Sequence, residues 1–205
     1  GHNHLMDVVA SLSRDSKIGP VRVNHKVSTT GDGTRKQGDV EISNFPISLR
    51  DGLVIDVSFV CEFKGSSRAP GGWNNGVRHS NDVLQARANV KNNKYKDVYG
   101  IVHKAFAPAI VGMSGQIHAD FLRLLWVLAD KQMRSYYESM GKEDKIGTEA
   151  FRWARAKVFN CNKTSVGRAI AFGCATRCHL SVHSLAMPRS GPDDGSHGGG
   201  GGGRG

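Results

Sequence analysis

Long hydrophobic runs and cysteines are scarce in this sequence of 205 residues. The longest uninterrupted apolar run extends from Leu124 to Ala129, far short of the roughly 20 residues that a membrane-spanning helix needs. The start of the chain carries no charged-then-apolar signal segment, so we expect no membrane partner. Four cysteines are too few for a disulfide framework, and they favour a reducing, intracellular compartment.

Acidic residues are also in deficit, with 18 against 28 basic residues and a net charge of +10. Residues 1–100 hold 10 acids and 14 bases, whereas residues 101–190 hold 6 acids and 13 bases. No acid occurs between Glu149 and Asp193. An excess of positive charge that is concentrated in one half of the chain predicts a nucleic-acid partner.

The glycines divide the chain into a body and a tail. Nine of the 26 glycines lie in residues 191–205, which we expect to be a disordered, flexible end. We assign residues 1–112 to a core domain and residues 113–190 to a basic helical extension. The chain begins with Gly1, inside a helical pattern, so we expect it to be a piece of a longer protein.

Hydrophobic periodicity predicts an α/β fold. We expect helices over residues 4–13, 77–96, 117–140, 149–159 and 165–185, and strands over residues 21–27, 39–42, 53–63 and 98–103. Pro108 and the glycines at 112 and 115 are predicted to interrupt the chain after the last strand. A helix, three strands, a helix and a further strand form a mixed sheet, which is followed by helices.

Asp56 interrupts the most apolar predicted strand, where burial of an unpaired carboxylate is costly. Asp39 begins the preceding strand. If these two strands pair, two carboxylates converge, and their hard oxygen atoms suit Mg²⁺ or Mn²⁺. The alternative is that Asp56 is a strand-end residue with a local partner.

Four features together resemble a known family. Gly38-Asp39 is followed after sixteen residues by Asp56-Val57-Ser58, then by a helix that ends in Lys91-Asn92-Asn93-Lys94-Tyr95. The stretch Ala105–Lys131 includes Ser-Gly-x-Ile-His at a helix start. Over residues 2–140 this order resembles the restriction-like (PD-(D/E)xK-type) endonuclease at the C-terminus of non-LTR retrotransposon reverse transcriptase polyproteins.

The resemblance implies a restriction-endonuclease-like fold and a role for each matching residue. Asp39 and Asp56 would hold the metal, Lys91 or Lys94 would supply the catalytic cation, and Tyr95 would support it. The sequence departs from the family at Ser58, where the plain motif has lysine, and at Gly38, where the family usually has proline. Both departures put the activity of this copy in question.

Two alternatives for the catalytic groups stay open. Glu62-Phe63-Lys64 is a literal acid-x-Lys motif, although an exposed Glu–Lys pair at a strand end needs no special explanation. A resolvase-like nuclease would place an acid on the first helix, and Asp7 is the candidate there, or else a solvated helix residue.

A cluster of soft ligands near the C-terminus raises the question of zinc. Cys161, Cys174, Cys178 and His183 are a candidate set, although their spacing matches no standard zinc finger. The alternative is that these cysteines pack in a helix of small residues. His2 and His4 would be the remnant of a Cys/His knuckle that commonly precedes this type of nuclease.

Basic residues supply the expected contacts to DNA phosphates. The predicted DNA-binding residues are Arg35, Lys36, Arg152, Arg155, Lys157, Lys163 and Arg168. Trp153 lies among them and is either a packing residue or a base-stacking one.

These patterns predict a metal-dependent endonuclease that nicks target DNA in the nucleus. The nick would prime reverse transcription by the rest of a polyprotein, which comprises the reverse transcriptase and its RNA. One rival is a non-catalytic or decayed nucleic-acid-binding module, and a weaker one is a structural RNA-binding protein.

Overall fold

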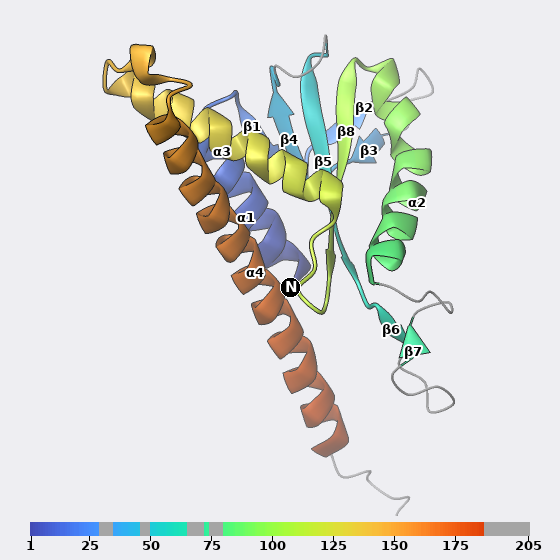
Figure 1. Cartoon of the computed structure of the whole chain (residues 1–205). Coiled ribbons are helices and arrows are strands. Elements are labelled where there is room, and N and C mark those ends of the chain that lie inside the picture. The colour runs from blue at the N-terminus through green and yellow to red at the C-terminus, as the bar shows by residue number, and fades with distance from the viewer. Residues whose placement is uncertain (29–34, 46–49, 65–71, 74–79, 187–205) are drawn as a thin grey trace, which may run out of the picture.

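The computed structural model describes residues 1–28, 35–45, 50–64, 72–73 and 80–186. It has an α/β architecture in which a helix precedes a four-stranded mixed sheet and helices follow it (Figure 1). This arrangement confirms the predicted order of helix, strands, helix, strand and C-terminal helices at the level of the main elements.

The central sheet has the order β1-β4-β5-β8. Its strands are β1 (Val21–Val23), β4 (Val40–Ser43), β5 (Gly52–Val60) and β8 (Lys104–Gly112). β4 pairs with β1 and with β5 in antiparallel fashion, and β5 pairs with β8 in parallel. Two small hairpins lie outside this sheet: β2 (Lys26–Ser28) with β3 (Arg35–Gln37), and β6 (Phe63–Lys64) with β7 (Gly72–Trp73).

Helices cover both faces of the sheet, because side chains alternate between the faces along each strand. α1 (His2–Asp15) and α3 (Ala119–Ser139) cover one face and share the main core with Leu53, Ile55 and Val57 of β5. α2 (Ser80–Ile101) covers the other face, where Val54 packs against Tyr99. Figure 1 shows α2 and α4 on opposite sides of the sheet.

α4 (Glu149–Ala186) packs mainly against α1 and α3, after a short 3₁₀ turn, η2 (Glu143–Lys145). Its Val166, Ala169 and Ile170 belong to the same core as the sheet. The expected boundary at residue 112 therefore does not divide two hydrophobic cores. Among the described helices, none is both long enough and apolar enough to cross a membrane.

Three local predictions were wrong. α2 continues to Ile101 where a strand over residues 98–103 was predicted, and the strand is β8 instead. Pro108 lies inside β8, because β8 is the edge of the sheet and loses no hydrogen bond to a further strand there. The two helices predicted over residues 149–185 are one continuous α4.

Candidate active site

The two predicted acids lie close to each other where β4 and β5 begin to pair. Asp56 lies within β5, and Asp39 directly precedes β4, whose pairing with β5 is recorded from Val40 and Ile55 onward. The Asp39 amide donates to the Ile55 carbonyl at 3.1 Å. Asp56 shares the α2 face with Val54, and its charge acts on the pKa of Asp39, so the two carboxylates are neighbours.

Asp39 also caps the edge of β5, which extends beyond the first residue of β4. Its Oδ2 accepts a hydrogen bond of 2.6 Å from the Val57 amide. His2 Nε2 lies 3.1 Å from the Val57 carbonyl and 3.2 Å from the same Asp39 Oδ2. Burial raises the pKa of Asp39 and the nearby Asp56 charge adds to this, while the Val57 amide, His2 and Lys91 act in the opposite direction.

Asp56 forms an ion pair with a lysine from α2. Lys91 Nζ lies 2.7 Å from Asp56 Oδ2, and both side chains are largely buried. The contact is not aligned as a hydrogen bond, so Oδ2 has no hydrogen-bond partner within the described part of the chain. A buried carboxylate oxygen with unused lone pairs is an atom at which a cation can bind.

The structure separates the two candidate lysines. Lys94 is exposed and lies over the Tyr95 ring, 4.9 Å from its centroid, whereas Lys91 contacts both Asp56 and the same ring at 5.6 Å. Tyr95 in turn packs on Phe106 of β8 at 5.5 Å between ring centroids. Tyr95 therefore supports the aliphatic and charged parts of Lys91, and Lys91 is the lysine at the acid pair.

Tyr99 completes the floor of this site one turn further along α2. Its ring stacks on Phe106 at 5.7 Å, and its buried hydroxyl has no hydrogen-bond partner among the described residues. Burial raises the pKa of Tyr99, and the negative charges of Asp56, Asp39 and Glu41 contribute in the same direction. Tyr99 is therefore a neutral phenol that faces the carboxylates.

Close packing requires a glycine at position 38, and the sequence did not reveal this requirement. A Cβ atom at this position would lie 2.2 Å from Val54 Cγ1 and 3.7 Å from the Tyr99 hydroxyl. Neither proline nor any other residue with a side chain fits without a shift of β5. The close contact between Gly38 and the strand beside it thus explains the glycine at this position.

Ser58 occupies the position at which the plain motif has lysine, and it contacts an arginine. Arg87 Nε donates to Ser58 Oγ at 3.2 Å, and Arg87 precedes Lys91 by one helical turn of α2. Because residues four apart share one helix face, two cationic side chains from α2 lie over Asp56 and Ser58. No sequence motif pointed to Arg87.

A second buried carboxylate, which sequence reasoning missed, lies two residues from Asp39. Glu41 accepts hydrogen bonds from Lys104 Nζ and, at 2.5 Å, from His25 Nδ1. Burial acts to raise the pKa of Glu41, but the Lys104 and His25 partners outweigh it and hold the pKa below its ordinary value. This cluster is satisfied by its own partners, which is typical of a structural ion pair.

The two alternative catalytic candidates lie away from the acid pair. Glu62 is fully buried beyond the end of β5 and accepts from the Ser114 hydroxyl, so the prediction of an exposed Glu–Lys pair was wrong for Glu62. The side chain of Lys64 lies outside the described residues. Asp7 is exposed on α1, and the α1 residue that contacts Asp39 is His2.

The candidate zinc ligands do not all share one place. Cys161 is exposed on α4, and Cys174 lies thirteen residues further along the same helix, a separation of about 20 Å at the helical rise. One ion therefore cannot bind both. The side chains of Cys178 and His183 lie outside the described residues, and no group of three or more ligands able to hold a metal occurs among those described.

The basic residues of α4 fall into two groups. Arg155 donates to Asp130 at 2.8 Å and lies over the Trp126 ring at 4.5 Å, so it links α4 to α3. Lys163 lies over Phe159, while Arg152, Lys157 and Arg168 are exposed. The side chains of Arg35 and Lys36 lie outside the described residues.

Comparison with known proteins leaves the chain without an assigned relative. No protein-family model matches it, and no curated protein sequence matches it. The geometry by itself offers two neighbouring carboxylates, of which Asp56 is paired with Lys91, and a second cationic side chain, Arg87, on the adjacent Ser58. Such a set can hold a divalent cation and an anionic phosphate together.

Proposed function

We propose that this chain is a metal-dependent DNA endonuclease domain with a restriction-endonuclease-like fold. The observation that carries the proposal is the position of Lys91 on Asp56, with Asp39 close by. Two carboxylates and one ammonium group, which suit hydrolysis of a phosphodiester, thus come from β5, the residue before β4 and the next helix. The net charge of +10 favours the same class of substrate.

Asp39 and Asp56 would hold the cation, Mg²⁺ or Mn²⁺, through hard carboxylate oxygens. The fit rests on the closeness of the two acids and on Asp56 Oδ2, a buried oxygen whose contact among the described residues is the Lys91 ammonium group and not an aligned hydrogen bond. When bound, such a cation polarises the phosphate and lowers the pKa of water. Zinc has no comparable support, because the cysteines at 161 and 174 are far apart on α4.

Hydrolysis that leaves a 3′-hydroxyl joins a water oxygen to phosphorus and breaks the bond to the 3′ oxygen, which takes up a proton. The phosphate oxygens gain negative charge in the transition state, and a fixed cation stabilises that charge. Lys91 is the nearest cation to the acid pair. Among the described residues Arg87 donates to Ser58 through Nε, so its two terminal amino groups suit a second phosphate contact.

The biological setting follows from the resemblance. In that setting the domain nicks chromosomal target DNA in the nucleus. The new 3′-hydroxyl then primes reverse transcription by the remainder of a polyprotein, which comprises the reverse transcriptase and its RNA.

The decisive experiment measures nicking of supercoiled plasmid with Mg²⁺ or Mn²⁺. We expect the wild-type protein to nick, and Asp56→Asn to lose nicking by about 10²-fold or more because it removes a ligand carboxylate. Asp51→Asn is the matched control, since Asp51 is exposed at the opposite end of β5. Equal nicking by the Asp56 variant would overturn the site.

A non-catalytic nucleic-acid-binding module is the second candidate. The Lys91–Asp56 ion pair favours it, since a lysine that neutralises a buried acid also serves folding alone. In that case the wild-type protein would bind DNA without metal-dependent cleavage, and Asp56→Asn would lower the melting temperature while leaving DNA affinity unchanged.

A further inference from the structure

The outer face of α4 carries an open groove far from the acid pair. Trp153, Ala156, Lys157, Asn160, Cys161 and Thr164 line it. These residues recur three or four positions apart, so they form one stripe along the helix. The inner face of the same helix is occupied by the core, to which it contributes Phe151, Val166 and Ala169.

Trp153 is the outstanding residue of this stripe. Its side chain is 73% exposed, more than any other large hydrophobic residue among those described. Tryptophan is highly buried on average, because its large apolar ring gains most from removal from water. The sequence left open whether Trp153 packs or stacks on a base, and its exposure shows that it is not packed against the described part of the chain.

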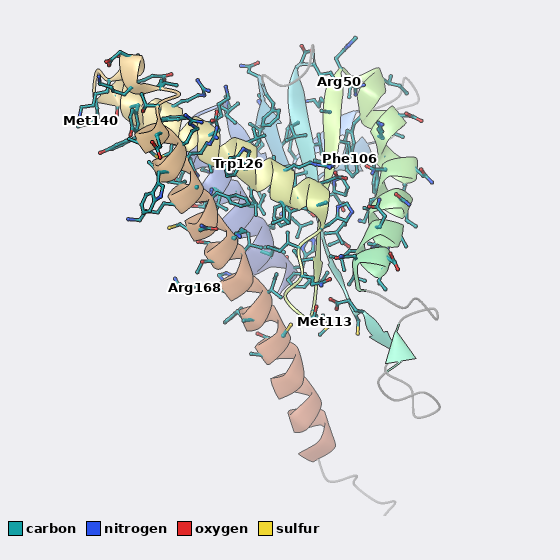
Figure 2. The ribbon with its side chains drawn as sticks, viewed as in Figure 1. Arg50, Phe106, Met113, Trp126, Met140 and Arg168 are labelled. Atoms are coloured by element: carbon teal, nitrogen blue, oxygen red, sulfur yellow. The ribbon has the colours of Figure 1, made fainter. Side chains whose placement is uncertain are left out.

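The charge around the stripe identifies the chemistry of the partner. Lys157 lines the groove, and the exposed residues Arg152 and Arg168 lie near its two ends. Arg168 lies on the side of α4 that faces away from the sheet (Figure 2). Glu149 is the only acid in α4, and it precedes the stripe. A flat indole between cations matches a nucleic-acid strand, in which aromatic bases alternate with phosphates.

The position of the stripe separates it from the acid pair. Asp56 and Lys91 lie on the α2 face of the sheet, whereas α4 packs on the outer side of α1 and α3, which cover the opposite face (Figure 1). Two helical layers at about 10 Å each therefore lie between the sheet and the outer side of α4. A phosphate held at Lys91 is consequently not part of the segment that contacts Trp153.

We infer that the outer stripe of α4 binds unpaired nucleic acid, through stacking of a base on Trp153 and phosphate contacts to Lys157. The strand must be unpaired because the bases of a duplex stack on one another and leave no face for the indole. The amide of Asn160 and the hydroxyl of Thr164 add polar contacts that any base can use. This inference does not rest on the nuclease activity, since it concerns another face of the molecule.

The test measures fluorescence anisotropy of a labelled oligothymidylate of about 15 nucleotides, which spans the usual site size of such surfaces. EDTA is present, so cleavage plays no part, and the full chain is used. Trp153→Ala is expected to weaken binding about 5- to 150-fold, the effect of losing one stacked base. Trp153→Phe is expected to retain most of the affinity.

Two further variants make the result specific. Lys157→Ala is expected to lower the slope of log affinity against log salt by about one. Ile101→Ala is the matched control, because Ile101 is also an exposed hydrophobic residue, 65% exposed at the end of α2, and its loss is expected to leave affinity unchanged.

Three outcomes would overturn the inference. The first is an unchanged affinity of Trp153→Ala for the oligonucleotide. The second is equal affinity of the wild-type protein for a duplex of the same length. The third is a dimer that Trp153→Ala converts to a monomer in sedimentation with no change in oligonucleotide affinity, which would make the stripe a protein interface. Absence of nicking by the wild-type protein would refute the nuclease proposal alone and leave these binding results intact.

Discussion

Lys91 reaches across from α2 to place its ammonium group 2.7 Å from Asp56 Oδ2. Lys94, only three residues away on the same helix, lies over the Tyr95 ring and remains exposed. Of these two lysines on one helix, Lys91 is the one that contacts the acid pair. This difference allows each to be tested against the other.

Substitution of Lys91 by methionine is expected to reduce plasmid nicking by about 10²–10³-fold, because it removes a fixed cation from the transition state. Lys94→Met, which changes the same charge three residues away, is expected to nick within about threefold of wild type, since exposed side chains of this kind contribute little. Single-turnover rates with saturating DNA measure the difference. If both variants lost the same amount of nicking activity, the effect would come from net charge, and the assignment of Lys91 would be contradicted.

Arg87 is expected to act on the phosphate rather than on folding. Arg87→Ala removes the guanidinium and is expected to lower the nicking rate about tenfold or more, with an unchanged melting temperature because the side chain is exposed. Added guanidinium ion is expected to restore part of the rate in this variant and to leave wild type unchanged. Lack of rescue, together with a lowered melting temperature, would show that Arg87 only holds Ser58.

Glu41 gives the protein a pH-dependent stability. Lys104 and His25 hold the pKa of the folded Glu41 below its ordinary value of 4.5. The unfolded chain therefore binds the proton more readily than the folded one. The stabilisation is fully present above about pH 4.5 and is lost as the pH falls through the lowered folded pKa.

Substitution Glu41→Gln removes this carboxylate and leaves Lys104 buried beside a neutral amide. We expect a loss of about 1–3 kcal/mol of unfolding free energy near neutral pH, as for a broken buried pair that retains a hydrogen bond. The difference from wild type is expected to shrink at acid pH. Urea titrations at a series of pH values measure it, and a difference that is independent of pH would contradict the role given to Glu41.

Loss of Arg155 is expected to lower stability, whereas loss of Arg152 is expected to weaken nucleic-acid binding. Asp130 pairs with Arg155 and with Arg134, and although burial acts to raise the pKa of Asp130, these two arginines hold it below its ordinary value. Arg155→Ala is therefore expected to cost about 1–3 kcal/mol of stability by uncoupling α4 from α3.

Arg152→Ala removes an exposed cation and is expected to leave stability within about 0.5 kcal/mol of wild type. It is expected to weaken oligonucleotide binding and to lower its salt dependence. Thermal melts and anisotropy titrations on both variants give the comparison. The same stability change in both would contradict the division of the basic residues into two groups.

The closeness of the two acids could be predicted from the sequence, because it depends on short-range rules. Alternation along a strand and pairing of consecutive strands bring Asp39 and Asp56 together. The choice between Lys91 and Lys94 was not within reach, because it depends on how α2 is rotated about its axis. That rotation is fixed by the burial of Leu84, Ala88 and Tyr99 against the sheet.

Contacts between distant segments could not be predicted, because no local sequence pattern marks them. His2 meets Asp39 because α1 begins beside the part of β5 that extends beyond β4. Lys104 meets Glu41 across an intervening strand, and neither partner is unusual in its own segment. The prediction that Pro108 interrupts the chain was wrong for a related reason, since the effect of a proline depends on which strand forms the edge of the sheet.

The continuity of α4 has a mechanical consequence. Its 38 residues form one uninterrupted helix about 57 Å long, at the rise of an α-helix. Its inner face is fixed to the same core that carries the acid pair. Two strands of nucleic acid that are bound on opposite sides of the helix and its core would therefore keep a constant separation and a constant angle.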